Sequence, residues 1–440
     1  MALWTFLQLA IGPSLLMPLF FTTHLLATAM KFSTAAILII IFTSTATTST
    51  LAASVRIRMP KGPVKPDSYI VLKSGANLED HIESITRIST RSPGSEFSVT
   101  YRYEMLNGYS AHAAGTSLSR ILICPEVDYV EADGIASSDS YLHHVNERDA
   151  AERDDAAVEM EDEDGPVGLE ARRVNGKEVM IFILNSGCLL NHISLESDEP
   201  DRHGGYLSRV SHGPAFGFAT HVDTHGEGTY MAGLTVGSPY SVSPGAVAIS
   251  LKICRDPSVV AWADLLASFQ FAHRQFILTP DLPTIVLITA SGPFNLAIND
   301  AIDRATSDGL HVVASAGNEN DDASFHSPAS APGAITVGAV DCSNAKLPVS
   351  NYGEVVDVFA PGSNILSAWR GMGLSQTRRM SGTGPAAALV ASNLARALGQ
   401  PMYKDMSPAE LAAELKRRAI RAVKHPLPVG TTDLLVQAWP

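Results

Sequence analysis

The sequence predicts an α/β protein: a doubly wound parallel sheet with helices on both faces, preceded by a small α+β domain of ferredoxin-like order. Two observations lead to this prediction. After residue 165, short continuous apolar runs alternate with amphipathic segments of helical period, which is typical of buried parallel strands joined by helices. Before residue 134, a shorter region reads strand, helix, strand, strand, helix, strand, the order of a ferredoxin-like domain.

Composition narrows the classes of partner. The chain has 440 residues, of which 45% are hydrophobic and 18% charged, with a formal net charge of −13. That charge argues against nucleic acid or anionic lipid as the main partner, because both require a basic surface. Four cysteines without a CxxC pair argue against a zinc cluster. We therefore expect a monomer that uses no metal and no cofactor.

The N-terminal region resembles a targeting signal. Residues 1–55 carry a single formal charge, Lys31, and the apolar run Ala35–Phe42 ends in small and hydroxyl residues. This pattern predicts a secretory signal peptide over residues 30–53, with residues 1–29 as an apolar extension and a secreted, extracellular product. One or two membrane anchors are the alternative, although the apolar run is short for a span of about 20 residues.

Residues 66–133 form the small domain and residues 134–165 a linker. The predicted elements of the domain, in order, are Tyr69–Lys73, Leu78–Ile88, Phe97–Tyr103, Gly108–Ala111, Leu118–Ile123 and Val127–Glu131. Within the linker, residues 147–164 hold ten carboxylates against two arginines. Such a segment is typical of a solvated linker, and an acidic interaction tail is the alternative.

Residues 166–437 form the large domain. Its predicted strands are Val179–Leu184, Ile285–Ala290, His311–Ala316, Ile335–Val340 and Val355–Phe359, and its predicted helices are Val260–Arg274, Leu296–Ser307, Ala386–Leu398 and Pro408–Val423. The last helix has a strong start signal, since Ser407 and Glu410 form a capping box around Pro408. In such a fold the functional site lies at the carboxyl ends of the strands.

Several long segments resemble the subtilisin-like serine proteases, nearest the secreted proteinase K-like branch. The segments are Asp223–Gly233, Val313–Asp341, Ser350–Trp369 and Ser381–Gly384, in the family's order. Residues 66–133 are similar to that family's inhibitory prodomain. The resemblance implies a peptidase domain over 166–437 and a prodomain whose C-terminal segment lies in the cleft as the chain's own partner.

The family's catalytic triad is substituted in this sequence. The resemblance aligns Asn185 with the aspartate, Glu227 with the histidine and Gly384 with the serine nucleophile. Glycine has no hydroxyl that could form an acyl-enzyme, and glutamate is a weaker base than imidazole near neutral pH. We therefore predict a secreted subtilisin-fold pseudoprotease without peptidase activity, a peptide-binding or decoy module.

The resemblance also marks the cleft. Asn318 occupies the oxyanion position, and one substrate-binding edge reads Thr289-Ala290-Ser291-Gly292. The opposite edge contains Ser258 and Val259, flanked by Pro257 and Val260. Proline removes a backbone donor and the valines are bulkier than glycine, so we expect peptide binding in the family's mode to be hindered.

Three alternatives remain open. The first is an active subtilisin-like serine endopeptidase, which family membership alone implies. The second is a module that holds a peptide, a protein or its own prodomain without cutting, and the third is the product of a decaying gene. A displaced triad of Asp223, His225 and Ser381 is not expected, because a skipped position turns a side chain away from the cleft and a catalytic group must lie within about 3 Å of its partner.

Overall fold

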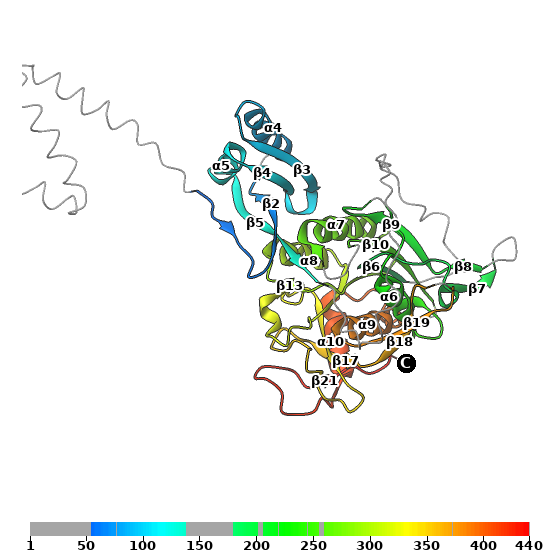
Figure 1. The fold of residues 1–440 in the computed structure, drawn as a ribbon. Coiled ribbons are helices and arrows are strands. Elements are labelled where there is room, and N and C mark those ends of the chain that lie inside the picture. The colour runs from blue at the N-terminus through cyan, green and yellow to red at the C-terminus, as the bar shows by residue number, and fades with distance from the viewer. Residues whose placement is uncertain are drawn as a thin grey trace, which may run out of the picture. The chain divides into compact units, whose positions relative to one another are not determined.

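The computed structural model describes two domains of the chain (Figure 1). The predicted signal peptide (30–53), the extension (1–29) and most of the linker lie outside the described residues. No helix among the described residues has the length and apolarity that crossing a membrane would require. The described residues are 54–75, 77–137, 179–200, 206–218, 220–243, 245–254, 259–371 and 373–439.

The small domain has the predicted ferredoxin-like topology. Its central strands lie in the order β5-β2-β4-β3 with antiparallel neighbours, and two helices cross between them. A short strand, β1, adds to the outer edge of β5 in parallel. The elements are β1 (Ile57–Arg58), β2 (Val64–Lys73), α4 (Leu78–Ser89), β3 (Glu96–Tyr103), the 3₁₀ turn η2 (Glu104–Leu106), β4 (Gly108–Ala114), α5 (Thr116–Leu122) and β5 (Val127–Ala136).

The large domain is built on a nine-stranded sheet in the order β20-β21-β17-β16-β14-β12-β6-β10-β9. Strands from β9 to β17 are parallel to their neighbours, so the predicted doubly wound sheet is confirmed. The strands are β6 (Val179–Asn185), β9 (Val210–Ala215), β10 (Ala246–Lys252), β12 (Thr284–Ile288), β14 (His311–Ser315), β16 (Ile335–Val340), β17 (Val358–Pro361), β20 (Ile420–Arg421) and β21 (Leu434–Leu435).

Helices cover both faces of this sheet (Figure 1). One apolar core joins one face of the strands to α6 (Glu227–Val236), α9 (Thr383–Leu398) and α10 (Pro408–Arg418). The other core joins the opposite face to α7 (Trp262–Leu278) and α8 (Leu296–Ser307). This second core continues into the small domain through side chains such as Tyr103 and Tyr129, so one sheet face of the small domain packs on α7 and α8.

Short elements complete the large domain. Among them, β11 pairs with β5 of the small domain, and β13 pairs with β15. They are η4 (Ile193–Leu195), β7 (Glu196–Pro200), β8 (Tyr206–Ser208), β11 (Val260–Ala261), β13 (Gly292–Pro293), η5 (Ala323–Phe325), β15 (His326–Ser327), β18 (Ile365–Ala368) and β19 (Thr377–Met380).

The capping box of α10 is confirmed, but the helix is shorter than predicted. Ser407 and Glu410 bond reciprocally at its start. It ends at Arg418, because Ala419 is extended and the next residues form β20 against β21. All four cysteines are free thiols, and Cys188 and Cys254 are buried.

Candidate functional site

Asn185 is the last residue of β6, at the carboxyl edge of the sheet, and its side chain is buried. The amide Nδ2 donates to Thr289 Oγ1 at 2.8 Å, while Oδ1 accepts from the Ser186 amide at 2.6 Å. Both ends of the amide therefore have hydrogen-bond partners, one of them on the predicted cleft edge at Thr289. A neutral group held in this way lends no charge to a neighbouring base.

Glu227 is the first residue of α6 and is 1% exposed. A carboxylate in the first turn of a helix is stabilised by the unpaired amides and the dipole of that helix. The loop before it is held by Asp223, which accepts from the amides of Gly226 (2.7 Å) and Thr229 (2.9 Å) and from the Ser186 hydroxyl (2.9 Å). This network fixes the start of α6 beside the end of β6.

Gly384 is the second residue of α9 and is buried. Asn318 lies against the first residue of α9: its Oδ1 accepts from the Thr383 amide at 2.9 Å and from the Thr383 hydroxyl at 3.2 Å. The structure thus brings the predicted oxyanion residue to the first turn of α9. Amide donors of a helix start and of an asparagine are groups that can stabilise a developing oxyanion.

The residues of the displaced triad have structural partners instead. Besides the contacts above, Asp223 accepts from the Thr229 hydroxyl at 2.6 Å. The His225 ring lies edge-on to Trp369, with centroids 5.7 Å apart, and the Ser381 hydroxyl accepts from the Asn364 amide at 2.8 Å. These contacts direct the three side chains to different neighbours.

The C-terminal end of the small domain pairs as an added strand with residues of both predicted cleft edges. Ile135 and Ala136 pair antiparallel with Ala261 and Val260, and Ser137 pairs with Ser291 on the other side. The backbone of Val260 pairs with Ala136 and its side chain is buried in the core, so Val260 does not prevent this segment of the chain from pairing there.

The other predicted cleft residues divide into buried and exposed groups. Thr289, Ala290 and Gly292 are buried, and Gly292 pairs with Ser327. Val259 is 54% exposed. Ser258 and Pro257 lie outside the described residues.

Two carboxylates of β5, missed in the sequence, attach the small domain to the helix starts. Glu131 accepts from the amides of Leu296 and Ala297, both at 3.0 Å, where α8 begins. Asp133 accepts from the Ala263 amide at 2.9 Å, where α7 begins. Burial raises the pKa of both carboxyl groups. Their alternation at the end of an apolar strand was the signal available in the sequence.

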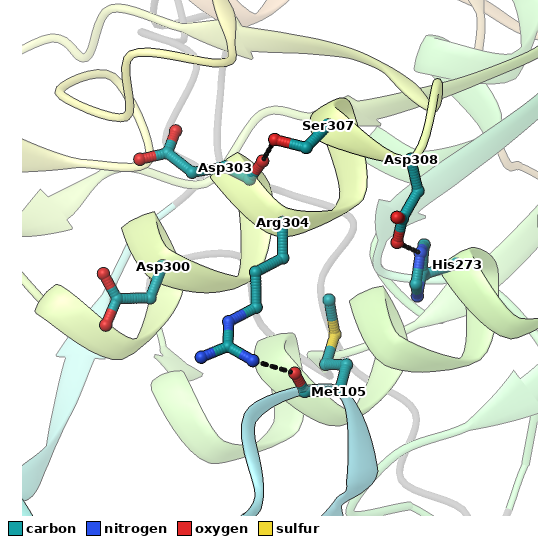
Figure 2. A pocket seen from close by; sticks show the side chains of 7 residues that line it. All are labelled: Met105, His273, Asp300, Asp303, Arg304, Ser307 and Asp308. Carbon is teal, nitrogen blue, oxygen red and sulfur yellow. Dashed lines mark hydrogen bonds and ion pairs between the residues drawn. The ribbon is translucent and has the colours of Figure 1, made fainter. Parts of the chain in front are cut away.

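A polar groove of about 580 Å³ lies between the small domain and the same helices (Figure 2). Arg304 donates to the Met105 carbonyl at 2.9 Å, and His273 pairs with Asp308 at 2.8 Å. None of its lining residues is one of the predicted site residues, so this groove is part of the domain contact and is separate from the cleft.

The comparisons with known proteins identify the large domain. The model of the subtilase family (Peptidase_S8) matches residues 176–437, more than half of the chain. Subtilisin-like protease 1 of Pseudogymnoascus destructans is 29% identical over 87% of this chain and 92% of its own length. The alkaline proteinase of Hapsidospora chrysogena is 32% identical over 73% of this chain and 80% of its own length. The cuticle-degrading serine protease of Arthrobotrys oligospora is 32% identical over 74% of this chain and 79% of its own length.

Solved structures agree on the fold. A cold adapted subtilisin-like serine proteinase superposes with a TM-score of 0.51 at 26% identity, covering 61% of this chain and 91% of that one. Fervidolysin from Fervidobacterium pennivorans, a keratinolytic enzyme related to subtilisin, superposes with a TM-score of 0.62 at 18% identity. The superposition covers 88% of this chain and 62% of fervidolysin. The second likeness concerns the fold alone.

These findings contradict the prediction of a pseudoprotease without peptidase activity. The relatives above are named as proteases, and nothing in the comparisons indicates an inactive branch. The prediction was based on three side chains, whereas the likeness extends over the whole domain, and the alternative of an active endopeptidase agrees better with it. By the family match and by its fold, this chain belongs to the subtilase family.

Proposed function

We propose that this chain acts in proteolysis and hydrolyses peptide bonds of an extended polypeptide held in the cleft. The observation that carries the proposal is the antiparallel pairing of residues 135–137 with Val260–Ala261 and Ser291. A cleft that takes up a strand by backbone hydrogen bonds on two sides fixes a polypeptide with little dependence on its sequence. The protease names of the relatives support the same reaction.

We further propose that Asn185, Glu227 and Gly384 occupy the triad positions and Asn318 the oxyanion position. Because glycine offers no hydroxyl, the attacking group in this proposal is water. Its oxygen adds to the carbonyl carbon while Glu227 takes its proton; the C–N bond then breaks and the amine leaves with that proton. Asn318 and the start of α9 supply donors for the oxyanion.

This route is expected to be slow. In subtilisin, loss of the serine or the histidine alone lowers kcat about 10⁶-fold, and the oxyanion hole and substrate binding retain roughly 10³- to 10⁴-fold over water. Glutamate is also a weaker base than imidazole near neutral pH. We therefore expect turnover well below that of a triad enzyme, and the assay must detect rare cleavage.

The remaining parts of the chain have roles in the same proposal. Residues 66–133 act as an inhibitor-like prodomain and are the chain's own partner in the cleft. Residues 30–53 act as a signal peptide, so the protein is secreted and works outside the cell as a monomer. The net charge of −13 supports a protein or peptide substrate over nucleic acid.

The test uses the full chain, secreted from a host that lacks extracellular proteases, with a specific cleavage site inserted among residues 147–164 so that the prodomain can be released. Wild type, Glu227→Gln and the exposed control Glu354→Gln are incubated with unfolded casein and a fluorophosphonate probe. The proposal predicts new peptides from wild type and control, none from Glu227→Gln, and no labelling. Stoichiometric labelling of a serine would overturn the water route, and absence of peptides would overturn proteolysis.

A further inference from the structure

We infer that the N-terminal arm, residues 54–63, holds the chain's own segment 135–137 in the cleft, and that this arm must detach from the large domain before an outside polypeptide can replace the segment. The inference goes beyond the proposed function, because it concerns which polypeptide occupies the cleft and is independent of whether the cleft cuts peptides. The arm precedes β2, and its two halves contact different domains.

The first half of the arm belongs to the small domain. The Val55 amide donates to the Leu122 carbonyl at 2.7 Å, and β1 pairs in parallel with β5. The Arg58 guanidinium lies over the Tyr129 ring, 4.4 Å from its centroid. Because β1 and β5 run in the same direction, the arm follows the outer edge of β5 toward the cleft.

The second half of the arm rests on the large domain. Gly62 lies against Pro293 of β13, since a Cβ atom placed on Gly62 would lie 2.6 Å from Pro293 Cγ. Lys61 Nζ lies 4.9 Å from the centroid of the Phe325 ring in η5, a cation–π contact. Pro293 follows Ser291 by two residues, so the arm reaches the large domain beside the cleft edge at Ser291.

The arm and Ser291 form one continuous edge for the cleft segment. The Ile135 amide donates to the Pro63 carbonyl at 2.9 Å, and the Ser137 amide donates to the Ser291 carbonyl at 2.8 Å. Residues two apart on a strand present their backbone groups to the same side, so both hydrogen bonds lie along one edge of the segment. Strand β11 pairs along the opposite edge. The segment is therefore bonded on two edges, and the arm supplies part of one of them.

Replacing this segment by an outside polypeptide requires the arm to detach. The segment is held at residue 137 by Ser291 and at residue 135 by Pro63, and Gly62 fixes Pro63 beside the cleft wall. Because arm and segment belong to one folded domain, a broken contact re-forms at high effective concentration before a second molecule arrives. The arm thus favours the chain's own segment over an outside polypeptide of the same backbone geometry.

The test measures amide exchange in the full chain and needs no catalysis. Gly62→Ala places a Cβ atom against Pro293 and should lift the arm, because added bulk at a packed contact forces a shift of the backbone. The matched control is Gly245→Ala, at a position where an added Cβ atom has no atom within 4 Å. A rescue variant, Pro293→Ala, removes Cγ and Cδ, the two atoms nearest to the added Cβ.

The readouts separate a lifted arm from an undocked or unfolded small domain. Fragments that contain the amides of Ile135, Ser137 and Ser291 report on the cleft segment. The Ala297 amide, which donates to Glu131 at 3.0 Å, reports whether the small domain stays docked. Fragments of β4 report whether that domain stays folded.

We expect Gly62→Ala to raise exchange at the cleft amides on the order of tenfold, with little change at Ala297 and in β4. Gly245→Ala should resemble wild type, and adding Pro293→Ala to Gly62→Ala should restore protection. Unchanged exchange at the cleft amides in Gly62→Ala, or an equal rise at Ala297, would overturn the inference.

A second pair of variants tests the same arm without adding bulk. Lys61→Ala removes the contact with Phe325 and should raise exchange at the cleft amides about twofold to fivefold. Arg56→Ala removes a charge from the exposed part of the first half and should change it little. An effect of Arg56→Ala as large as that of Lys61→Ala would also overturn the inference. Failure to cut casein leaves these results unchanged, so the two proposals fail separately.

Discussion

Ser137 and Ser291 exchange both of their backbone hydrogen bonds, the amide of each donating to the carbonyl of the other at 2.8 and 2.7 Å. The last described residue of the small domain is therefore a strand partner of the cleft wall. Two residues earlier, the Ile135 amide donates to the Pro63 carbonyl at 2.9 Å, so the entering segment is also held by its own domain.

Replacing Glu131 by glutamine should weaken the attachment of the small domain. The two carboxylate oxygens accept from Leu296 and Ala297, and a glutamine would oppose one of these donors with its own NH₂. We expect a loss of roughly 1–3 kcal/mol in the free energy of docking. Amide exchange at the start of α8 measures it. Asp128→Asn, on the exposed side of the same strand, is the control; a loss of the same size there would show that Glu131 has no specific role.

Docking should strengthen on mild acidification. A third carboxylate, Asp264 of α7, accepts from the Tyr101 hydroxyl of the small domain at 2.8 Å. Burial raises the pKa of Glu131, Asp133 and Asp264 above their ordinary values of 4.5, 3.8 and 3.8. The docked state then binds more protons than the undocked state. The contribution of these groups to the free energy of docking is therefore fully present below their ordinary pKa values and is lost as pH rises through the raised pKa values.

The pH effect is measured as exchange at the Ser291 amide between about pH 4 and pH 7, corrected for intrinsic rates. The triple variant Glu131→Gln, Asp133→Asn, Asp264→Asn should flatten the profile. Docking that weakens steadily as pH falls through this range would contradict the prediction.

The small domain itself should lose stability in acid through His81. Burial, and then the charge of Lys73, lowers the pKa of His81 from 6.5 to about 4. As pH falls, His81 is protonated in the unfolded domain before it is protonated in the folded one. Its contribution to the free energy of unfolding is therefore fully present above pH 6.5 and is lost as pH falls toward 4. Exchange in α4 as a function of pH checks this, with His112→Gln as the exposed control. His81→Gln should remove the dependence, and an unchanged profile in that variant would assign the acid loss to another group.

Restoring the triad should greatly increase cleavage. The variant Asn185→Asp, Glu227→His, Gly384→Ser supplies nucleophile, base and orienting carboxylate in a cleft that already accepts a strand. We expect a gain on the order of 10⁴- to 10⁶-fold in turnover of casein after release of the prodomain. Ser381→Ala in that background should leave the gain intact. A rate equal to wild type would show that the cleft does not present substrate to position 384.

The sequence predicted the elements whose pattern is strong and local. Leu296–Ser307 and Ile335–Val340 match α8 and β16 residue for residue. It missed β10, where Ser250 and a buried Lys252 break the apolar pattern; Lys252 donates to the distant Val222 carbonyl. It gave no amphipathic pattern for α6 because that helix is buried on every side.

The candidate site was less predictable because its contacts are long-range. Strand β5 was expected to end at Glu131, yet it continues to Ala136. Its residues Ala132 and Gly134 pair with β2, and Ile135 and Ala136 pair with β11, more than a hundred residues later. Motif alignment located Asn185 and Gly384, but three side chains were too narrow a basis for predicting the activity of the whole domain.

The most direct test of the account is the rate at which new amino termini appear when the prodomain-released chain is incubated with an unfolded polypeptide. We expect a slow rate that is proportional to enzyme concentration, persists in Glu354→Gln and is lost in Glu227→Gln. A wild-type rate indistinguishable from that of Glu227→Gln would contradict it.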